Sequence, residues 1–144
     1  MNNQFNYPVK LTKQKEGGYM AQLVDFPEAI TQGETLEETL NEAIDCLEEA
    51  IAHRISKKLA IPMPSHIKKS HHAISLPTTF IAKIALYLAM KEKKMTNIHL
   101  AKKLDCDEKE IRRLLDLHYN SKLPRIEEAL GKLGKRLEVH VVSF

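Results

Sequence analysis

Apolar and polar positions alternate in two short stretches near the start of the chain, residues 7–12 and 19–24. A period of two residues is typical of strands with one buried face. Gly17 and Gly18 lie between the stretches and accept the positive φ angles that a hairpin turn requires. The pattern therefore predicts two adjacent antiparallel strands.

A third strand and a helix are expected next. Residues 25–27 are expected to break the second strand, and residues 29–32 to form a short third strand that ends at Gly33. Thr35 and Glu38 form a capping-box pattern, in which side-chain oxygens accept hydrogen bonds from open backbone N–H groups. Apolar residues recur behind it at helical spacing, which predicts a helix with one face on the sheet and acidic residues on the other.

The segment from residue 59 to residue 76 is rich in proline, serine and histidine. Its histidines have no defined scaffold and no further ligands at a suitable spacing, which favours a solvated linker over a metal site. Its last residues, 71–76, are expected to return to the first sheet as an edge strand. Pro77 marks the boundary that we predict between a domain of residues 1–76 and a domain of residues 77–144.

The second half of the chain has helical spacing. A helix is expected to begin at Thr78 or Thr79 and to run to about Lys93. Residues 80–90 are apolar almost all round, apart from Lys83. Such a helix is expected to be buried on more than one side.

The stretch from Thr96 to Asp116 has the apolar spacing of a helix-turn-helix, with Ala101 as the small residue where two helices cross. Asp105 and Cys106 form the expected turn, and Asp107 is placed to cap the second helix. The turn usually has glycine in the left-handed conformation, which aspartate tolerates better than most residues. The apolar positions that join the two helices are Leu100, Leu104, Ile111, Leu114 and Leu115.

This motif places its second helix in the major groove of DNA. The second helix is basic, and basic and polar residues follow it. The predicted DNA-binding residues are Thr96, Asn97, Lys109, Arg112, Arg113, Asn120, Ser121 and Lys122. The alternative is a structural helical bundle with a solvated face, because Glu108, Arg112 and Asp116 also form a ladder of opposite charges at helical spacing.

The chain is expected to end with a helix and a strand. Pro124 suits the first turn of a helix and Gly134 its end, and residues 137–142 alternate like a strand. That strand has no assigned partner in its own domain. Because one recognition helix reads only a few base pairs, we expect a homodimer or a higher oligomer, with the strand and residues 80–90 as candidate contacts.

Charge is divided unequally along the 144 residues, although the formal net charge is only +3. Residues 1–53 hold three basic and ten acidic residues, a net charge of −7, whereas residues 77–144 hold fourteen basic and nine acidic residues, a net charge of +5. An acidic surface attracts a basic partner, and a basic surface attracts a phosphate backbone. The two ends are therefore expected to bind different partners.

Composition narrows the class of protein. With 43% hydrophobic and 28% charged residues, the chain is typical of a globular protein. The amino terminus has no signal-peptide pattern, and the longest apolar stretch, residues 80–90, is too short to span a bilayer. Cys46 and Cys106 lie far apart in the sequence and form no CxxC motif. Their spacing therefore indicates neither a zinc site nor a disulfide framework. We expect a cytoplasmic protein without a cofactor.

Five short motifs in the first half carry a resemblance to a known family by their order and spacing. They are Tyr7-Pro8-Val9, Glu16-Gly17-Gly18-Tyr19, Asp25-Phe26-Pro27-Glu28-Ala29, Thr31-Gln32-Gly33-Glu34-Thr35 and Leu36-Glu37-Glu38. The chain resembles the HicB antitoxin family, one branch of which joins such a module to a carboxyl-terminal helix-turn-helix of the phage-repressor type. The resemblance covers nearly the whole chain.

The resemblance implies an α+β fold. A small antiparallel sheet with one covering helix, partial ribonuclease-H-like in fold, is followed by an all-α helix-turn-helix domain with a C-terminal strand. It also implies that the protein binds a HicA-like toxin, a small basic ribonuclease that cuts mRNA, and represses the toxin–antitoxin operon at operator DNA. The toxin contacts are expected on the sheet and its loops, at Tyr19, Asp25, Phe26, Glu28 and Glu34.

Two other interpretations stay open. A ribonuclease-H-type nuclease needs several carboxylates around two metal ions, but residues 7–13 and 19–24 contain no Asp or Glu, and Asp25 is better explained as a turn residue. The chain also has no nucleophile–histidine pattern and no phosphate-binding glycine loop, so an enzyme is not expected. The second alternative is a solitary helix-turn-helix transcription regulator whose first domain binds a ligand or another protein.

Overall fold

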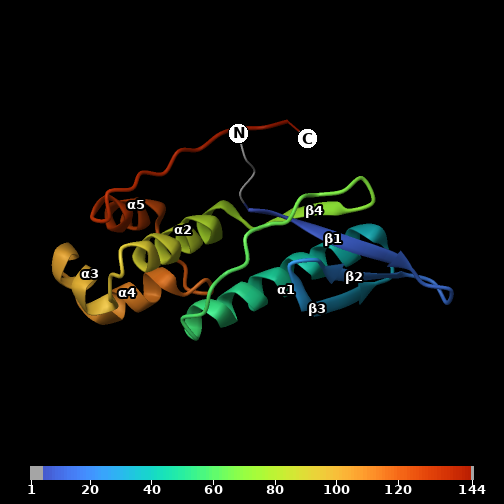
Figure 1. Cartoon of the computed structure of the whole chain (residues 1–144), viewed down its shortest axis with the longest axis horizontal. Coiled ribbons are helices and arrows are strands. Elements are labelled where there is room, and N and C mark those ends of the chain that lie inside the picture. The colour runs from blue at the N-terminus through green and yellow to red at the C-terminus, as the bar shows by residue number, and fades with distance from the viewer. Residues whose placement is uncertain (1–4, 144) are drawn as a thin grey trace. The chain divides into compact units, whose positions relative to one another are not determined.

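The computed structural model describes residues 5–143, and the chain divides into two compact units at Pro77. Among these residues, unit 1 carries a sheet and one long helix, and unit 2, which begins at Thr78, carries four helices (Figure 1). None of the helices in the described part of the chain is both long and apolar enough to cross a lipid bilayer.

Unit 1 is built on a four-stranded antiparallel sheet, which confirms the predicted α+β class. Its strands are β1 (Asn6–Lys13), β2 (Tyr19–Leu23), β3 (Phe26–Gly33) and β4 (His72–Ser75), in the order β3-β2-β1-β4. The register places Val9 opposite Leu23 and Leu11 opposite Ala21. Apolar side chains of neighbouring strands therefore share one face of the sheet.

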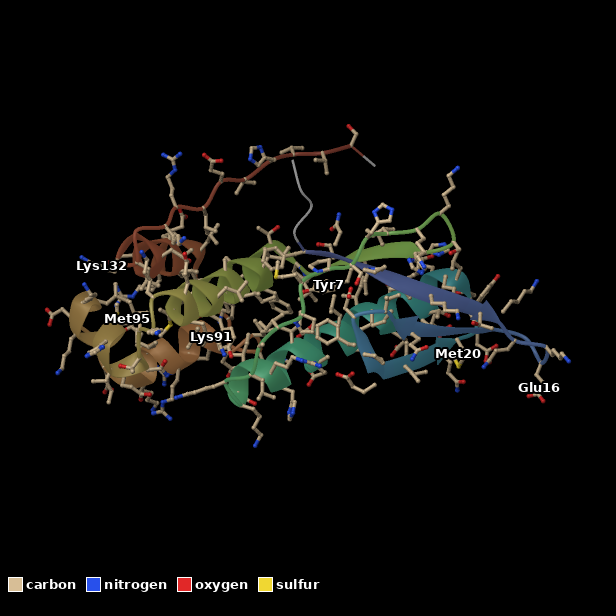
Figure 2. All side chains as sticks on the ribbon, viewed as in Figure 1. Tyr7, Glu16, Met20, Lys91, Met95 and Lys132 are labelled. Atoms are coloured by element: carbon tan, nitrogen blue, oxygen red, sulfur yellow. The ribbon has the colours of Figure 1, made fainter. Side chains whose placement is uncertain are left out.

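The hairpin between β1 and β2 closes at the two predicted glycines. Gly17 and Gly18 have φ angles of 98° and 78°, which side chains other than hydrogen rarely allow. A Cβ atom on Gly18 would also lie 2.6 Å from the carbonyl oxygen of Gly33. Figure 2 shows Glu16 at the tip of this hairpin. Glycine is therefore required at position 18 for two independent reasons.

Helix α1 (Leu36–Ser56) begins with the predicted cap. The hydroxyl of Thr35 accepts a hydrogen bond from the backbone N–H of Glu38 at 3.1 Å, and the Glu38 carboxylate accepts one from the N–H of Glu34 at 3.3 Å. The helix packs against β2 and β3 and covers one face of the sheet (Figure 1). Its buried residues are Thr39, Ala43, Leu47, Ile51 and Ile55.

Strand β3 begins at Phe26 rather than at the expected Ala29, so the break after β2 is shorter than the sequence pattern indicated. The pairing of β2 with β3 is irregular near Gln22, where Leu23 lies opposite Phe26 although Gln22 lies opposite Ile30. Proline is tolerated at such irregular, edge positions because its missing N–H is not needed there. Pro27 therefore interrupts the ladder without ending the strand.

Strand β4 confirms the expected return of the chain to the sheet. It pairs in antiparallel fashion with residues 6–9 of β1. The connection from α1 is fastened by the phenol of Tyr7, which donates a hydrogen bond to the carbonyl of Pro62 at 2.8 Å. Burial, and secondarily the nearby Asp25 carboxylate, raise the pKa of Tyr7 to about 12, so the phenol keeps its proton and its role as a donor.

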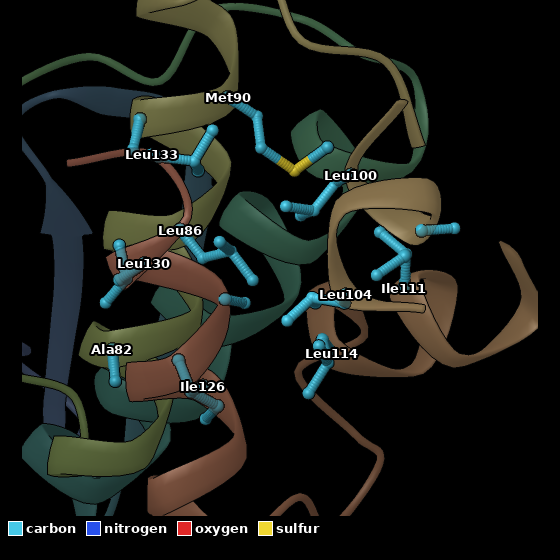
Figure 3. Close-up of a cluster of buried hydrophobic side chains, with 13 residues drawn as sticks. Ala82, Leu86, Met90, Leu100, Leu104, Ile111, Leu114, Ile126, Leu130 and Leu133 are labelled. Atoms are coloured by element: carbon cyan, nitrogen blue, oxygen red, sulfur yellow. The ribbon is translucent and has the colours of Figure 1, made fainter. Parts of the chain in front are cut away.

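Unit 2 is a bundle of short helices around one core. They are α2 (Thr78–Glu92), α3 (Asn97–Leu104), α4 (Glu108–Leu115) and α5 (Leu123–Gly131). Helix α2 packs against α4 and α5, and α3 packs against α4. The core, shown in Figure 3, consists of Ala82, Leu86, Ala89, Met90, Leu100, Ala101, Leu104, Ile111, Leu114, Ile126, Ala129, Leu130 and Leu133. As predicted, Pro124 lies in the first turn of α5.

The C-terminal strand expected over residues 137–142 is not formed in this single chain. Leu137 packs against the core of unit 2, but Val139, Val141 and Val142 are 69%, 96% and 75% exposed. A strand needs a neighbour for its backbone hydrogen bonds, and within the described residues the sheet is completed by β4 without this segment. The alternation of side chains alone therefore did not produce a strand.

Candidate functional site

The turn between α3 and α4 has the geometry that the sequence predicted. Asp105 adopts the left-handed conformation, with φ 53° and ψ 50°, and its N–H donates to the last turn of α3. Thr96 and Asp107 cap the two helices by accepting hydrogen bonds from the N–H groups of His99 and Lys109, both at 3.1 Å. The side chains of Thr96 and Asp107 thus begin α3 and α4, and the backbone of Asp105 ends α3.

Buried apolar residues join α3 to α4 at the predicted positions. They are Leu100, Ala101 and Leu104 on α3 and Ile111 and Leu114 on α4, and the half-buried Leu115 packs against the same core. An ion pair also fastens α4 to α5, because the guanidinium of Arg125 lies 2.6 Å from the carboxylate of Glu110 and lowers the pKa of that carboxyl group. The outward face of α4 is therefore held on a packed scaffold.

That outward face carries the three predicted basic residues, Lys109, Arg112 and Arg113, all of them exposed. Arg112 forms an ion pair with Glu108 at 2.9 Å, one turn earlier on the helix. The guanidinium of Arg113 lies over the ring of Tyr119, 5.3 Å from its centroid. The face is thus basic and projects from the helix side opposite the core.

The other predicted DNA-binding residues differ in how accessible they are. Thr96 and Asn97 begin α3, and the Asn97 amide lies 3.5 Å from the Glu108 carboxylate. Asn120 and Lys122 are exposed in the loop before α5, but Ser121 is half-buried. The structure therefore brings these residues to the two ends of the α3–α4 pair, with Ser121 turned toward the protein.

Lys83 is the residue of this region whose role the sequence did not reveal. It lies on α2, is fully buried, and its ammonium donates to the carbonyls of Arg113, Asp116 and Tyr119 at 2.9, 2.7 and 2.6 Å. It also lies 2.9 Å from the hydroxyl of Ser121. Burial lowers the pKa of Lys83 to about 8, against the opposing effect of the Asp116 carboxylate.

In unit 1, two of the predicted toxin contacts are engaged inside the protein. Phe26 is fully buried, 5.4 Å from the ring of Tyr7, with the guanidinium of Arg54 over its face at 4.5 Å. The Asp25 carboxylate accepts hydrogen bonds from both the backbone N–H and the hydroxyl of Ser65. Phe26 is therefore a core residue and Asp25 fixes the chain that leads to β4.

The remaining predicted contacts are more accessible. Tyr19 is half-buried, and Glu28 and Glu34 are exposed. The Glu28 carboxylate forms an ion pair with Arg54 at 3.0 Å, and the backbone N–H of Glu28 together with Arg54 lowers the pKa of Glu28. Glu28 and Glu34 thus place two acidic side chains on the surface, the first near the start of β3 and the second just after its end.

The sheet has a second face that sequence reasoning did not single out. We call it the outer face, and the strand registers place on it Lys10, Thr12, Met20, Gln22, Ile30 and Gln32. Met20 is 36% and Ile30 is 53% exposed, and Figure 2 shows Met20 among the side chains at the sheet. The sequence did contain a signal for this face, because its residues alternate along each strand with the buried residues.

A groove of about 810 Å³ includes part of the outer face. The loop of residues 65–71 forms one side of it, where His71 accepts a hydrogen bond through Nδ1 from the backbone N–H of Lys68 at 3.2 Å. Its lining also includes Lys10, Gln22 and Val24. One ring nitrogen of His71 is therefore committed to the turn of its own loop.

The protein thus has two units, one with an open sheet face and one with an exposed basic helix. The family model described as HicB-like antitoxin of bacterial toxin-antitoxin system matches residues 6–85. The chain belongs to this family.

Curated relatives match over nearly the whole chain. Antitoxin HicB of Escherichia coli (strain K12) is 38% identical over 136 residues, which cover 94% of this chain and 99% of the relative. Antitoxin HicB 1 of Photorhabdus laumondii subsp. laumondii is 30% identical over 135 residues, with coverage of 94% and 86%. Antitoxin HicB of Pseudomonas fluorescens (strain Pf0-1) is 29% identical over 138 residues, with coverage of 95% and 94%. The similarity therefore includes unit 2 as well as unit 1.

Proposed function

We propose that this protein is the antitoxin of a type II toxin–antitoxin system, which neutralises a HicA-like mRNA-cleaving toxin through unit 1 and represses its own operon through unit 2. The observation that carries this proposal is the match to relatives named antitoxin HicB over 94% or more of the chain. A protein that matches throughout both units shares the architecture on which a joint role of this kind depends.

Unit 1 offers the outer face as the toxin-binding surface. Only one of its six residues, Lys10, is charged, and Met20 on β2 and Ile30 on the edge strand β3 expose apolar area on it. Interface cores have this composition, poor in charge and surrounded by a polar rim. Glu28 and Glu34 lie on the neighbouring surface, and the excess of acid over residues 1–53 favours encounter with a basic ribonuclease.

Unit 2 offers α3 and α4 as a DNA-binding helix-turn-helix. The left-handed turn at Asp105, the buried crossing at Ala101 and the exposed basic face of α4 support this assignment. A structural bundle would need the same core, but it has no need for Lys109, Arg112 and Arg113 on one outward face. We therefore propose α4 as the recognition helix in the major groove of operator DNA.

The protein acts by binding rather than by catalysis in this proposal, and it does so in the cytoplasm, where its mRNA-cleaving partner and its operator are found. The strand–strand–strand–helix–strand order of unit 1 supports the partial ribonuclease-H-like fold that the family resemblance implies. Asp25, which a nuclease of that kind would offer to a metal ion, is instead bound to Ser65. Its carboxylate serves the structure of unit 1.

An RNA-cleavage assay tests this proposal. The full chain, added to the ribonuclease encoded beside its own gene, is expected to stop cleavage of an mRNA and to cleave none itself in magnesium. A toxin that stays fully active, or the absence of a toxin gene beside this one, would favour the alternative of a solitary transcription regulator. Magnesium-dependent cleavage by the protein alone would make it an enzyme.

A further inference from the structure

Lys83 is a charged residue in the centre of an apolar helix. Its neighbours on α2 include Ala82, Leu86 and Met90, which belong to the core of unit 2, and its own side chain is 0% exposed. Removing an ammonium group from water is unfavourable unless hydrogen bonds replace the lost hydration. A methionine would fill the same space without this penalty, so the charge needs an explanation beyond packing.

The explanation lies at the C-terminal end of α4. Four acceptor atoms surround the three N–H donors of Lys83, the carbonyls of Arg113, Asp116 and Tyr119 and the hydroxyl of Ser121, all within 2.9 Å. The last carbonyls of a helix lack partners in the helix and carry partial negative charge. The buried Lys83 ammonium therefore holds both the end of α4 and the loop that follows it.

The same contacts fix the surroundings of an exposed arginine. The carbonyl of Arg113 and the carbonyl of Tyr119 both accept from Lys83, and the Tyr119 ring lies beneath the Arg113 guanidinium. Lys83 thus joins the end of α4 to the following loop through their backbone carbonyls, and the Arg113 and Tyr119 side chains of the same two segments contact each other at the surface. The loop also carries Asn120, whose side chain is exposed.

We propose that Lys83 is a positioning residue for DNA binding, which holds the end of α4 and the loop 116–121 so that Arg113, supported by Tyr119, is presented to the DNA backbone. This inference rests on the proposed DNA-binding function of unit 2. Lys83 itself does not reach the DNA, because it is buried and its donors are occupied.

The test uses the full chain and a duplex from the promoter region of its own operon. Lys83→Met keeps the apolar stem and removes the ammonium, and it is expected to fold and to bind the duplex about tenfold more weakly. Arg113→Ala should lower the slope of the salt dependence by about 1, and Lys83→Met should lower it in the same direction and by no more than that, because it weakens the phosphate contact of Arg113. Lys132→Met, which removes an exposed lysine after α5, controls for the loss of one charge.

A double-mutant cycle separates positioning from a general loss of stability. If Lys83 acts through Arg113, Lys83→Met should weaken binding much less in an Arg113→Ala background than in the wild type. Tyr119→Leu removes the ring beneath the guanidinium, a ring whose centroid also lies 5.8 Å from the Lys83 ammonium, but keeps the backbone carbonyl that accepts from Lys83. Its effect on DNA binding should likewise be much smaller in an Arg113→Ala background, and this can be measured even if Lys83→Met does not fold. Additive effects in the double variants would overturn the role of Lys83. An unchanged affinity for the promoter duplex in folded Lys83→Met or folded Tyr119→Leu would also overturn it. A wild-type protein that binds no promoter duplex would overturn the DNA-binding proposal as well.

Discussion

Lys83 and Asp105 show how single residues can serve a fold in ways that their usual preferences oppose. Lys83 is buried although lysine favours water, and Asp105 is left-handed although most residues avoid positive φ angles. Asp105 was found from sequence because the turn lies within a local spacing pattern. The sequence showed Lys83 only as the one charged residue of an apolar stretch. It did not predict the role of Lys83, because the partners of this residue lie 30–38 positions further along the chain.

The turn residue gives a simple stability prediction. Asp105→Ala should lower the free energy of unfolding by about 1 kcal/mol, because alanine has no short polar side chain to support the left-handed conformation. Asp105→Gly should lower it less or raise it, since glycine adopts that conformation without a steric penalty. Urea unfolding of the three proteins measures this. Equal losses in both variants would show that the Asp105 side chain, rather than the backbone angle, matters at this position.

The pKa of Lys83 gives a prediction about pH. In the folded chain it is about 8, below the ordinary value of 10.5. Between these two values the unfolded chain binds more protons than the folded one, so this group makes the free energy of unfolding rise with pH. Wild type is therefore expected to gain stability relative to Lys83→Met over that range, as measured by urea unfolding of both proteins. A difference that stays constant with pH would contradict the lowered pKa.

At the scale of helices and strands, sequence reasoning succeeded where the signal was local. The glycines of the first hairpin, the cap at Thr35 and the turn at Asp105 each depend on residues a few positions apart. The start of β3 was missed because Pro27 reads as a strand breaker, and only the irregular pairing of β3 with β2 shows why the strand tolerates it. The burial of Phe26 was missed because its partners in the fold, Tyr7 and Arg54, are distant in sequence.

Helix α4 yields a prediction of its own. Lys109→Ala, Arg112→Ala and Arg113→Ala should each leave the core of unit 2 intact, since Ile111 and Leu114 hold the helix. Loss of a base contact should weaken binding to the promoter duplex by about 1–3 kcal/mol, and loss of a phosphate contact should reduce the salt dependence. Titrations at two salt concentrations distinguish these cases. Unchanged affinity in the triple variant would leave the structural bundle as the better interpretation.

At the scale of the whole molecule, the two units combine opposite charges, and one recognition helix is too small to select an operator alone. We propose that a second copy supplies the second helix and that the segment of residues 137–142 joins the copies. Val139, Val141 and Val142 are exposed there, and pairing with the same segment of another copy would give their backbones the partners that a strand requires.

Removal of residues 139–144 tests this assembly. The truncated protein keeps Leu137, which packs against the core, and it is expected to be a monomer by light scattering at concentrations where the full chain is a dimer. Val141→Glu, at a position that is 96% exposed, should have the same effect without shortening the chain. A dimer of undiminished strength in both proteins would place the contact elsewhere.

The central claim is that one protein carries two separate surfaces, the outer face for the toxin and the face of α4 for DNA. Ile30→Asp places a charge on the outer face, and Ile98→Asp is its matched control, since Ile98 is 59% exposed on α3. Inhibition of RNA cleavage by the toxin and binding to the promoter duplex are measured for both variants and for the Lys109, Arg112 and Arg113 triple variant.

Ile30→Asp is expected to lose toxin inhibition and to keep DNA binding. The triple variant is expected to do the reverse, and Ile98→Asp is expected still to inhibit the toxin. Full toxin inhibition by Ile30→Asp, in a protein shown to be folded, would contradict the central claim.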